Sequence, residues 1–103
     1  MGLIVQKYGG SSLADKERII NVARRIVETK REGNKVIAIV SAMGKTTDKL
    51  IQMAREISEV PPKREMDRLL STGEQISMSL LAMAIQAMGE KASLTLGAES
   101  WSQ

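Results

Sequence analysis

The sequence predicts an α/β sandwich with a mainly parallel sheet. Short apolar stretches typical of strands alternate with segments in which apolar residues recur at helical spacing. The second of these stretches is continuously apolar, as expected for a strand covered on both faces, which is the pattern of parallel sheets. The expected order of elements is β, α, β, α, α, β, and this alternation predicts right-handed crossovers between parallel strands.

The first strand is expected over Leu3–Tyr8, and the small residues at positions 9–12 end it. Asp15 can cap the helix that follows, because its carboxylate can accept hydrogen bonds from the free amides of the first turn. The apolar residues of this helix share one face, and they are Ile19, Val22, Ala23, Ile26 and Val27. Gly33 then ends the helix, since glycine readily adopts a left-handed backbone conformation.

The second strand is expected over residues 35–41, followed by a loop over residues 42–45. A second helix is expected to begin at Thr46 or Thr47 and to stop at Pro61. The residues predicted for its inner face are Leu50, Ile51, Ala54 and Ile57.

A third helical segment is expected from about Arg64 to Ala87, with room for a bend near residues 71–73. Gly89 is expected to close this helix. Residues 91–96 are then predicted to form a third strand. The chain has 103 residues, which corresponds to one domain at most.

The composition excludes several kinds of chemistry. The sequence contains no cysteine and no histidine, which rules out disulfides, Cys/His zinc sites and catalysis by these side chains. The two aromatic residues, Tyr8 and Trp101, offer few rings for stacking on bases, which argues against a nucleic-acid partner. The net charge of +3 arises from mixed charges rather than from one basic tract, as on solvated helix faces.

Membrane insertion is not predicted. The longest uncharged stretch, residues 75–89, is shorter than the ~20 residues that a spanning helix needs, and it contains polar side chains. The apolar stretch at residues 3–5 is too short for a signal peptide. We therefore expect a cytoplasmic protein without a membrane partner.

Two loops fall beyond the carboxyl ends of the predicted strands, where ligands bind in open α/β sheets. In the first loop, Gly9 and Gly10 allow backbone amides to approach an anion closely, while Ser11 and Ser12 add hydroxyl donors. The following helix directs the positive end of its dipole to the same place. Lys7 supplies a compact positive charge suited to phosphate. The alternative is a simple tight turn with a solvated Lys7.

The second loop contains Gly44-Lys45-Thr46, which suggests a P-loop. That motif needs a glycine five residues before Gly44, where Ile39 stands, so we reject the P-loop interpretation. Ser41, Thr46 and Thr47 remain as hydroxyl donors for a small polar ligand. Thr46 can instead serve as a helix cap.

Glu74 precedes the apolar run at residues 76–85. A carboxylate near a helix start can cap the helix or complement its dipole, and composition alone favours this interpretation. The functional alternative is a carboxylate that holds the ammonium group of a substrate.

Together these segments resemble the amino-terminal part of aspartate kinase, in the amino-acid kinase superfamily. Three motifs carry the resemblance: Val5-Gln6-Lys7-Tyr8-Gly9-Gly10-Ser11-Ser12, residues 40–48, and residues 64–75. Tyr8 and Ser11 stand where the family has phenylalanine and threonine. The match extends over about residues 2–96, so residues 1–96 are expected to form the front of a kinase domain, and residues 97–103 form an unmatched tail.

The resemblance implies an enzyme of amino-acid biosynthesis with a three-layer α/β/α sandwich. This enzyme would transfer the γ-phosphoryl group of ATP to the side-chain carboxylate of aspartate, with Mg²⁺. Lys7 would be the catalytic residue that stabilises the transferring group, and the ATP phosphates would be held by Lys7, Gly9, Gly10, Ser11 and Ser12. The residues implied for the aspartate site are Ser41, Ala42, Thr47 and Glu74, of which Glu74 would bind the α-amino group. No metal ligand is implied within this chain.

Two functions remain open at this stage. The family's nucleotide-binding half is not found, so we expect an incomplete form of the enzyme that does not turn over ATP at a normal rate alone. The alternative is a non-catalytic small-ligand binding or interaction module derived from the kinase fold. In either case, part of a parallel sheet would expose a strand edge and an apolar face. This predicts self-association into a homo-oligomer, and the alternative is a monomer with partly molten behaviour.

Overall fold

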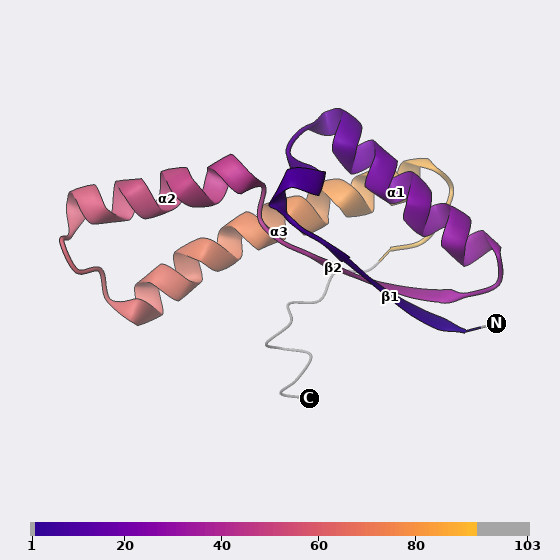
Figure 1. Ribbon diagram of the computed structural model, residues 1–103, viewed down its shortest axis with the longest axis horizontal. Coiled ribbons are helices and arrows are strands. Elements are labelled where there is room, and N and C mark those ends of the chain that lie inside the picture. The colour runs from indigo at the N-terminus through magenta and orange to yellow at the C-terminus, as the bar shows by residue number, and fades with distance from the viewer. Residues whose placement is uncertain (1, 93–103) are drawn as a thin grey trace.

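The computed structural model describes residues 2–92, in which a two-stranded parallel sheet carries helices on one face (Figure 1). Strand β1 (Leu3–Tyr8) pairs with β2 (Lys35–Val40), with Leu3 opposite Lys35 and Tyr8 opposite Val40. Because the two strands are parallel and in register, their carboxyl ends lie at the same edge of the sheet. The predicted α/β class with a parallel sheet is confirmed.

Helix α1 (Lys16–Arg31) connects the strands after a short 3-10 helix, η1 (Gly10–Leu13). Asp15 is the N-cap of α1, and its Oδ1 accepts a hydrogen bond of 2.9 Å from the backbone amide of Arg18. Gly33 follows the helix with a φ of 98°, a conformation that favours glycine. Both helix boundaries therefore confirm the sequence prediction.

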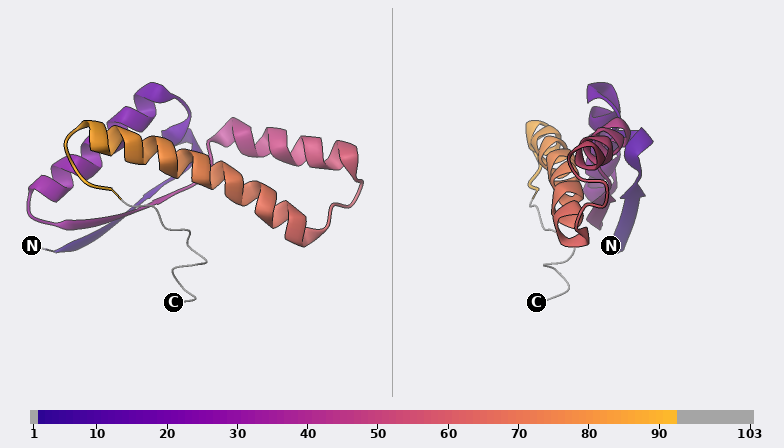
Figure 2. Two further views of the ribbon diagram at one scale, coloured as in Figure 1. Left: turned by 180° about the vertical axis from the view of Figure 1, so that it is seen from behind. Right: turned by 90° about the vertical axis from the view of Figure 1, so that its left-hand side faces the viewer.

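Helices α2 (Gly44–Ile57) and α3 (Lys63–Ala87) form an antiparallel pair that extends beyond the end of the sheet (Figures 1 and 2). The predicted start of α2 at a threonine is wrong, because the helix begins at Gly44 and its N-cap is Met43, which makes no side-chain capping bond. Helix α3 runs without interruption through residues 71–73.

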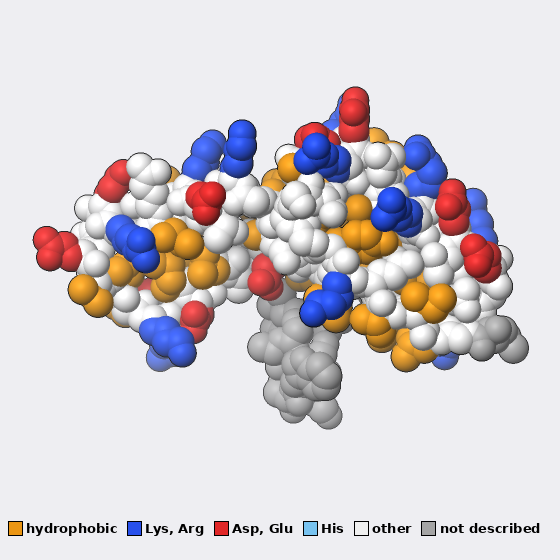
Figure 3. All heavy atoms as spheres, viewed as in Figure 1, with side chains coloured by type: hydrophobic (Ala, Val, Ile, Leu, Met, Phe, Trp, Pro, Cys, Tyr) orange, Lys and Arg blue, Asp and Glu red, His pale blue; other side chains and the backbone are white. Residues whose placement is uncertain are grey.

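The inner face predicted for α2 is correct only in part. Leu50, Ile51 and Ala54 are half-buried, whereas Ile57 is 83% exposed. The two helices diverge toward the loop that joins them, so the end of α2 has no neighbour to pack against (Figure 1). Apolar side chains consequently gather at the surface of this helical pair and along the strands (Figure 3).

The hydrophobic core lies between α1, α3 and the inner face of the sheet. All five apolar residues predicted for the inner face of α1 are buried there. Leu13 of η1 is fully buried and closes the end of the core nearest the carboxyl ends of the strands. The buried residues of the core are Tyr8, Leu13, Ile19, Val22, Ala23, Ile26, Val27, Leu81 and Ile85.

The opposite face of the sheet is open in the part of the chain that the structure describes. Side chains alternate along a strand, so Leu3 and Val5 of β1 point away from α1, as do Ile37 and Ile39 of β2. Each of these four side chains is between 49% and 62% exposed. The expectation that the second strand is covered on both faces is therefore wrong for residues 2–92. A continuous apolar run does not indicate which segment covers the second face of the strand.

The molecule is correspondingly flat and elongated. Its principal extents are 50 × 33 × 17 Å and its radius of gyration is 15.3 Å, compared with ~13 Å for a compact domain of 100 residues. Gly89, with a φ of 89°, follows α3 as predicted. The third strand predicted for residues 91–96 lies outside the described residues from position 93 onward. None of the described helices is long and apolar enough to cross a membrane.

The burial of Leu13 leads to a stability prediction. We expect Leu13→Ala to lower the free energy of unfolding by about 2–5 kcal/mol, because it leaves a cavity beneath η1. Val60→Ala is the matched control, since Val60 is 85% exposed and its substitution should change stability by less than about 0.5 kcal/mol. Urea unfolding of both variants measures the difference. Equal effects would show that Leu13 does not anchor η1.

Candidate functional site

The parallel pairing of the strands brings the first two sequence motifs together at one edge of the sheet. Lys7 and Tyr8 end β1, and Ser41 directly follows β2. The pairing continues one step beyond β2, since the amide of Ser41 donates a hydrogen bond of 3.1 Å to the carbonyl oxygen of Tyr8. The two loops therefore start from a shared, fixed point.

Gly10 places the first loop in direct contact with the second. A Cβ atom at Gly10 would lie 3.0 Å from the carbonyl oxygen of Ala42 and 3.0 Å from the amide nitrogen of Gly44. These are backbone atoms, which cannot move aside as the end of a flexible side chain can. The contact therefore favours glycine at position 10, because a larger residue would have to displace backbone atoms of the second loop.

Gly73 brings the third motif to the same place. It is buried in the interior of α3, and a Cβ atom there would lie 2.9 Å from the Cβ of Ala42. The side chains of Thr46 and Leu50 lie 3.9 Å from that position. Ala42 is thus approached by Gly10 from one side and by Gly73 from the other. The three motifs that are distant in sequence share this single point of contact.

The predicted phosphate-binding residues surround the end of β1. Lys7 is exposed on the open face of the sheet, because the next residue of the strand, Tyr8, is buried on the side of α1. Gly9 is the N-cap of η1 and is exposed. Ser11 and Ser12 are exposed within η1.

The residues predicted for the aspartate site come from the end of β2, the second loop, α2 and α3. Ser41 is exposed at the end of β2, Ala42 is half-buried, and Thr47 is half-buried in the first turn of α2. Glu74 is exposed and follows Gly73 in the interior of α3. Glu74 is therefore not at a helix start, and the capping interpretation favoured by composition is wrong.

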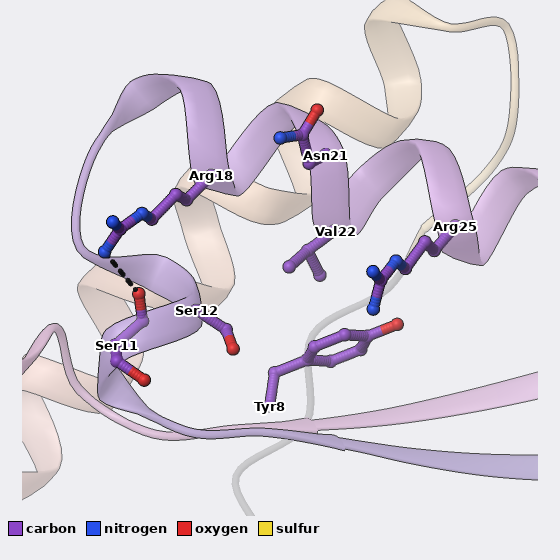
Figure 4. A pocket seen from close by; sticks show the side chains of 7 residues that line it. All are labelled: Tyr8, Ser11, Ser12, Arg18, Asn21, Val22 and Arg25. Carbon is purple, nitrogen blue, oxygen red and sulfur yellow. Dashed lines mark hydrogen bonds between the residues drawn. The ribbon is translucent and has the colours of Figure 1, made fainter.

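Ser11 and Ser12 also line a pocket on the helix side of the sheet (Figure 4). Its volume is about 410 Å³, and its described lining consists of Tyr8, Ser11, Ser12, Arg18, Asn21, Val22 and Arg25. Lys7 is not part of this lining. Arg18, Asn21 and Arg25 were not predicted as site residues from the sequence. The signal that could have indicated them is the seven-residue spacing of the two arginines, which is about two helical turns.

A chain of hydrogen bonds fixes Tyr8 at the floor of this pocket. The Tyr8 hydroxyl donates to Oε1 of Gln6 at 2.7 Å, and Nε2 of Gln6 donates to Oγ1 of Thr29 at 3.1 Å. The Thr29 hydroxyl in turn donates to the carbonyl oxygen of Arg25 at 2.8 Å. The bond between Gln6 and Thr29 ties β1 to the last turn of α1.

Burial raises the pKa of Tyr8 above its ordinary value of 10.0, because the charged phenolate loses contact with water. The positive charge of Arg25 acts in the opposite direction and lowers the pKa of Tyr8, but the effect of burial is larger. The guanidinium group of Arg25 lies next to the Tyr8 ring (Figure 4).

The model of the Amino acid kinase family matches residues 2–100, and the chain belongs to this family.

Within the family, the chain resembles the aspartate kinases, as the three motifs predicted. It is 61% identical over 92 residues to the aspartokinase of Bacillus sp. (strain MGA3), and 58% identical over 100 residues to that of Mycolicibacterium smegmatis. These matches cover 89% and 97% of this chain but only 22% and 24% of the two relatives. The chain therefore spans about a quarter of their length.

A solved structure shows the same relationship. The crystal structure of aspartate kinase from Synechocystis matches with a TM-score of 0.89 at 52% sequence identity. The match covers 93% of this chain and 16% of that chain. The arrangement of strands and helices described above is thus the arrangement found in an aspartate kinase.

The contact between Gly73 and Ala42 can be tested by a double-mutant cycle. Gly73→Ala should lower the free energy of unfolding by about 1–3 kcal/mol through overpacking, offset in part by the ~1 kcal/mol helix preference of alanine. Adding Ala42→Gly should restore much of the loss, because it removes the atom that the new Cβ meets. Denaturant unfolding of the four proteins measures this coupling.

Gly44→Ala is the control for this cycle. Gly44 has no atom within 4 Å of a Cβ placed on it, so alanine there should not destabilise the protein. Strictly additive effects of Gly73→Ala and Ala42→Gly would contradict the contact.

Tyr8 is the single tyrosine of the sequence, so its ionisation can be followed by absorbance at 295 nm. The midpoint should lie above 10.0 in the folded protein and return to its ordinary value in denaturant. Because the folded-state pKa is raised, the associated stability is present below pH 10 and is lost as the pH rises through the folded-state pKa. Arg25→Gln should raise the midpoint further, whereas Arg24→Gln should not. A folded-state midpoint at or below the denatured value would be inconsistent with a buried Tyr8.

Proposed function

We propose that this chain holds aspartate and the transferring phosphoryl group in an aspartate kinase reaction. A side-chain carboxylate oxygen of aspartate attacks the γ-phosphorus of ATP, and the bond from that phosphorus to the bridging oxygen of ADP breaks. The products are aspartyl phosphate and ADP. The observation that supports this function best is the shared contact at Ala42, which gathers the three motifs at one edge of the sheet.

The first loop suits the phosphate groups of ATP. The backbone amides of Gly9 and Gly10 and the exposed hydroxyls of Ser11 and Ser12 offer donors to phosphate oxygens. Lys7 stands near the end of β1, and its long stem lets the ammonium group reach past the edge of the sheet. Enzymes that transfer phosphoryl groups act mainly by positioning and by neutralising charge, and this is the role proposed for Lys7.

The second loop and α3 suit the amino-acid substrate. Ser41 and Thr47 offer hydroxyl groups, and the exposed carboxylate of Glu74 can pair with the α-ammonium group of aspartate. The close approach of Gly73, the neighbour of Glu74, to Ala42, the neighbour of Ser41, supports this assignment. Aspartate and the transferring phosphoryl group would meet where the two loops adjoin.

The family implies Mg²⁺ together with ATP, and Mg²⁺ bound to the phosphates neutralises part of their charge. Within residues 2–92, no group of three or more carboxylates gathers to hold a metal ion. Bound to ATP, Mg²⁺ takes most of its ligands from phosphates and water and needs only one or two carboxylates from a protein. The hydroxyl and amide donors of the first loop would act on the phosphate oxygens themselves.

We also propose that the chain acts in the cytoplasm, where ATP is available, and that it forms a homo-oligomer. The open apolar face of the sheet, with its exposed Leu3, Val5, Ile37 and Ile39, supports self-association.

Separate calorimetric titrations with aspartate and with MgATP test these assignments. Glu74→Gln should weaken aspartate binding about tenfold or more and leave MgATP binding unchanged, because a charge-assisted hydrogen bond contributes roughly 1.5–3 kcal/mol. Lys7→Ala should weaken MgATP binding and leave aspartate binding unchanged. In an active form of the enzyme, Lys7→Ala should also cost about 3–4 kcal/mol of transition-state stabilisation.

Two matched variants serve as controls. Glu59→Gln removes an exposed carboxylate outside the site, and Lys35→Ala removes an exposed ammonium from the opposite end of the sheet. Both should bind aspartate and MgATP like the unmodified chain. Unchanged aspartate affinity in Glu74→Gln, or unchanged MgATP affinity in Lys7→Ala, would reject the role assigned to that residue.

A further inference from the structure

We propose that the pocket between η1 and α1 binds a small phosphate-bearing anion, at a site distinct from the edge where phosphoryl transfer is proposed. The pocket shares Ser11 and Ser12 with the loop proposed to hold the ATP phosphates, and the inference goes beyond that proposed role. It rests on the lining of the pocket, on how that lining is held in place, and on its position relative to Lys7.

The lining of the pocket is strongly cationic. Arg18 and Arg25 lie two turns apart along one side of α1, with Asn21 and Val22 between them (Figure 4). The seven described residues of the lining include two guanidinium groups and no carboxylate. Oδ2 of Asp15 lies 3.9 Å from Nε of Arg18, close to the distance limit of an ion pair. Asp15 therefore neutralises the positive charge of Arg18 only weakly.

Hydrogen bonds to neighbouring protein groups orient two of the pocket's donors. Nη1 of Arg18 donates to the carbonyl oxygen of Ser11 at 3.0 Å, which fixes the guanidinium group beside η1 and leaves its other N–H groups for a ligand. Oδ1 of Asn21 accepts a hydrogen bond of 3.0 Å from Nη1 of Arg24, so its amide NH₂ group remains as a donor. The Ser12 hydroxyl points toward the space above the Tyr8 ring (Figure 4).

The floor of the pocket is rigid. The Tyr8 hydroxyl proton is committed to Gln6, and Gln6 is held by Thr29, so the ring serves as a fixed apolar surface rather than as a donor. A site held in place before binding loses less conformational entropy when it takes up a ligand. A volume of about 410 Å³ lies within the range of small-molecule sites, large enough for a pyrophosphate or a small phosphate ester.

The ligand is identified by these donors. Guanidinium groups match the geometry of phosphate oxygens and remain charged at every physiological pH. The set combines two guanidinium groups with the amide of Asn21, and the Ser11 and Ser12 hydroxyls that it shares with the first loop extend it, so several oxygens of one phosphate or pyrophosphate group can be satisfied. A phosphate-bearing anion therefore fits better than a monocarboxylate, which presents only two oxygens.

The arginines of the pocket lie away from the proposed transfer edge, although Ser11 and Ser12 belong to both. Lys7 is exposed on the open face of the sheet, whereas the pocket lies on the face that α1 covers. Gly10 contacts Ala42 and Gly44 of the second loop, and neither of these residues lines the pocket. An anion in the pocket would hold η1 from the side of α1, through Ser11 and Ser12.

A titration of the chain with pyrophosphate, followed by ¹H–¹⁵N NMR, tests the proposal. We expect saturable shifts of the Asn21 side-chain amide and of Nε of Arg18 and Arg25. Arg18→Gln and Arg25→Gln should each weaken binding about tenfold, because each removes charge-assisted hydrogen bonds. Arg25→Lys keeps the charge but loses the planar fork of donors, and should bind with an affinity between those of Arg25→Gln and the unmodified chain.

Arg55→Gln is the matched control, because it removes one exposed positive charge from α2, away from the pocket. It should bind pyrophosphate like the unmodified chain, and circular dichroism should show the same helix content in every variant. Shifts confined to Gly10 and Gly44, or equal weakening by Arg55→Gln, would overturn the proposal. Citrate that binds as tightly as pyrophosphate would overturn the phosphate assignment.

Discussion

The close approach of three backbone segments at Ala42 is the constraint on which the site depends. Parallel strands bring two carboxyl ends to one edge, but they do not fix how near the loops come to each other or to α3. The missing side chains of Gly10 and Gly73 allow both segments to press on Ala42. Because packed backbone atoms yield little, this contact sets the positions of the strand-end lysine, the second loop and the carboxylate of α3 relative to one another.

Much of the fold could be predicted because its signals are local. The carboxylate of Asp15 marks the start of α1, and Gly33 and Gly89 mark helix ends with left-handed backbones. The start of α2 was mispredicted because Met43 caps the helix without a side-chain hydrogen bond, and such a start leaves no mark in the sequence. The open face of β2 was also missed, since an apolar strand gives no indication of what covers it.

The candidate site, too, could be predicted from the sequence only in part. Its loops could be located because hydroxyl-rich and glycine-rich segments follow each strand and match a family. Their mutual contact could not be predicted, because it depends on the distance of an α3 residue from a loop about thirty positions earlier in the chain. The arginines of the pocket were missed for another reason: on a helix, exposed arginines look the same whether they face bulk water or the rim of a cavity.

The open face of the sheet also determines how stability varies with temperature. The heat-capacity change of unfolding arises mainly from apolar surface that becomes hydrated. Leu3, Val5, Ile37 and Ile39 are already about half hydrated in the folded chain, so each adds less to this change than a fully covered side chain would. The stability curve of the chain is consequently flatter than that of a domain of equal length whose sheet is covered on both faces. Only part of the apolar surface of the strands thus contributes to the heat-capacity change of unfolding.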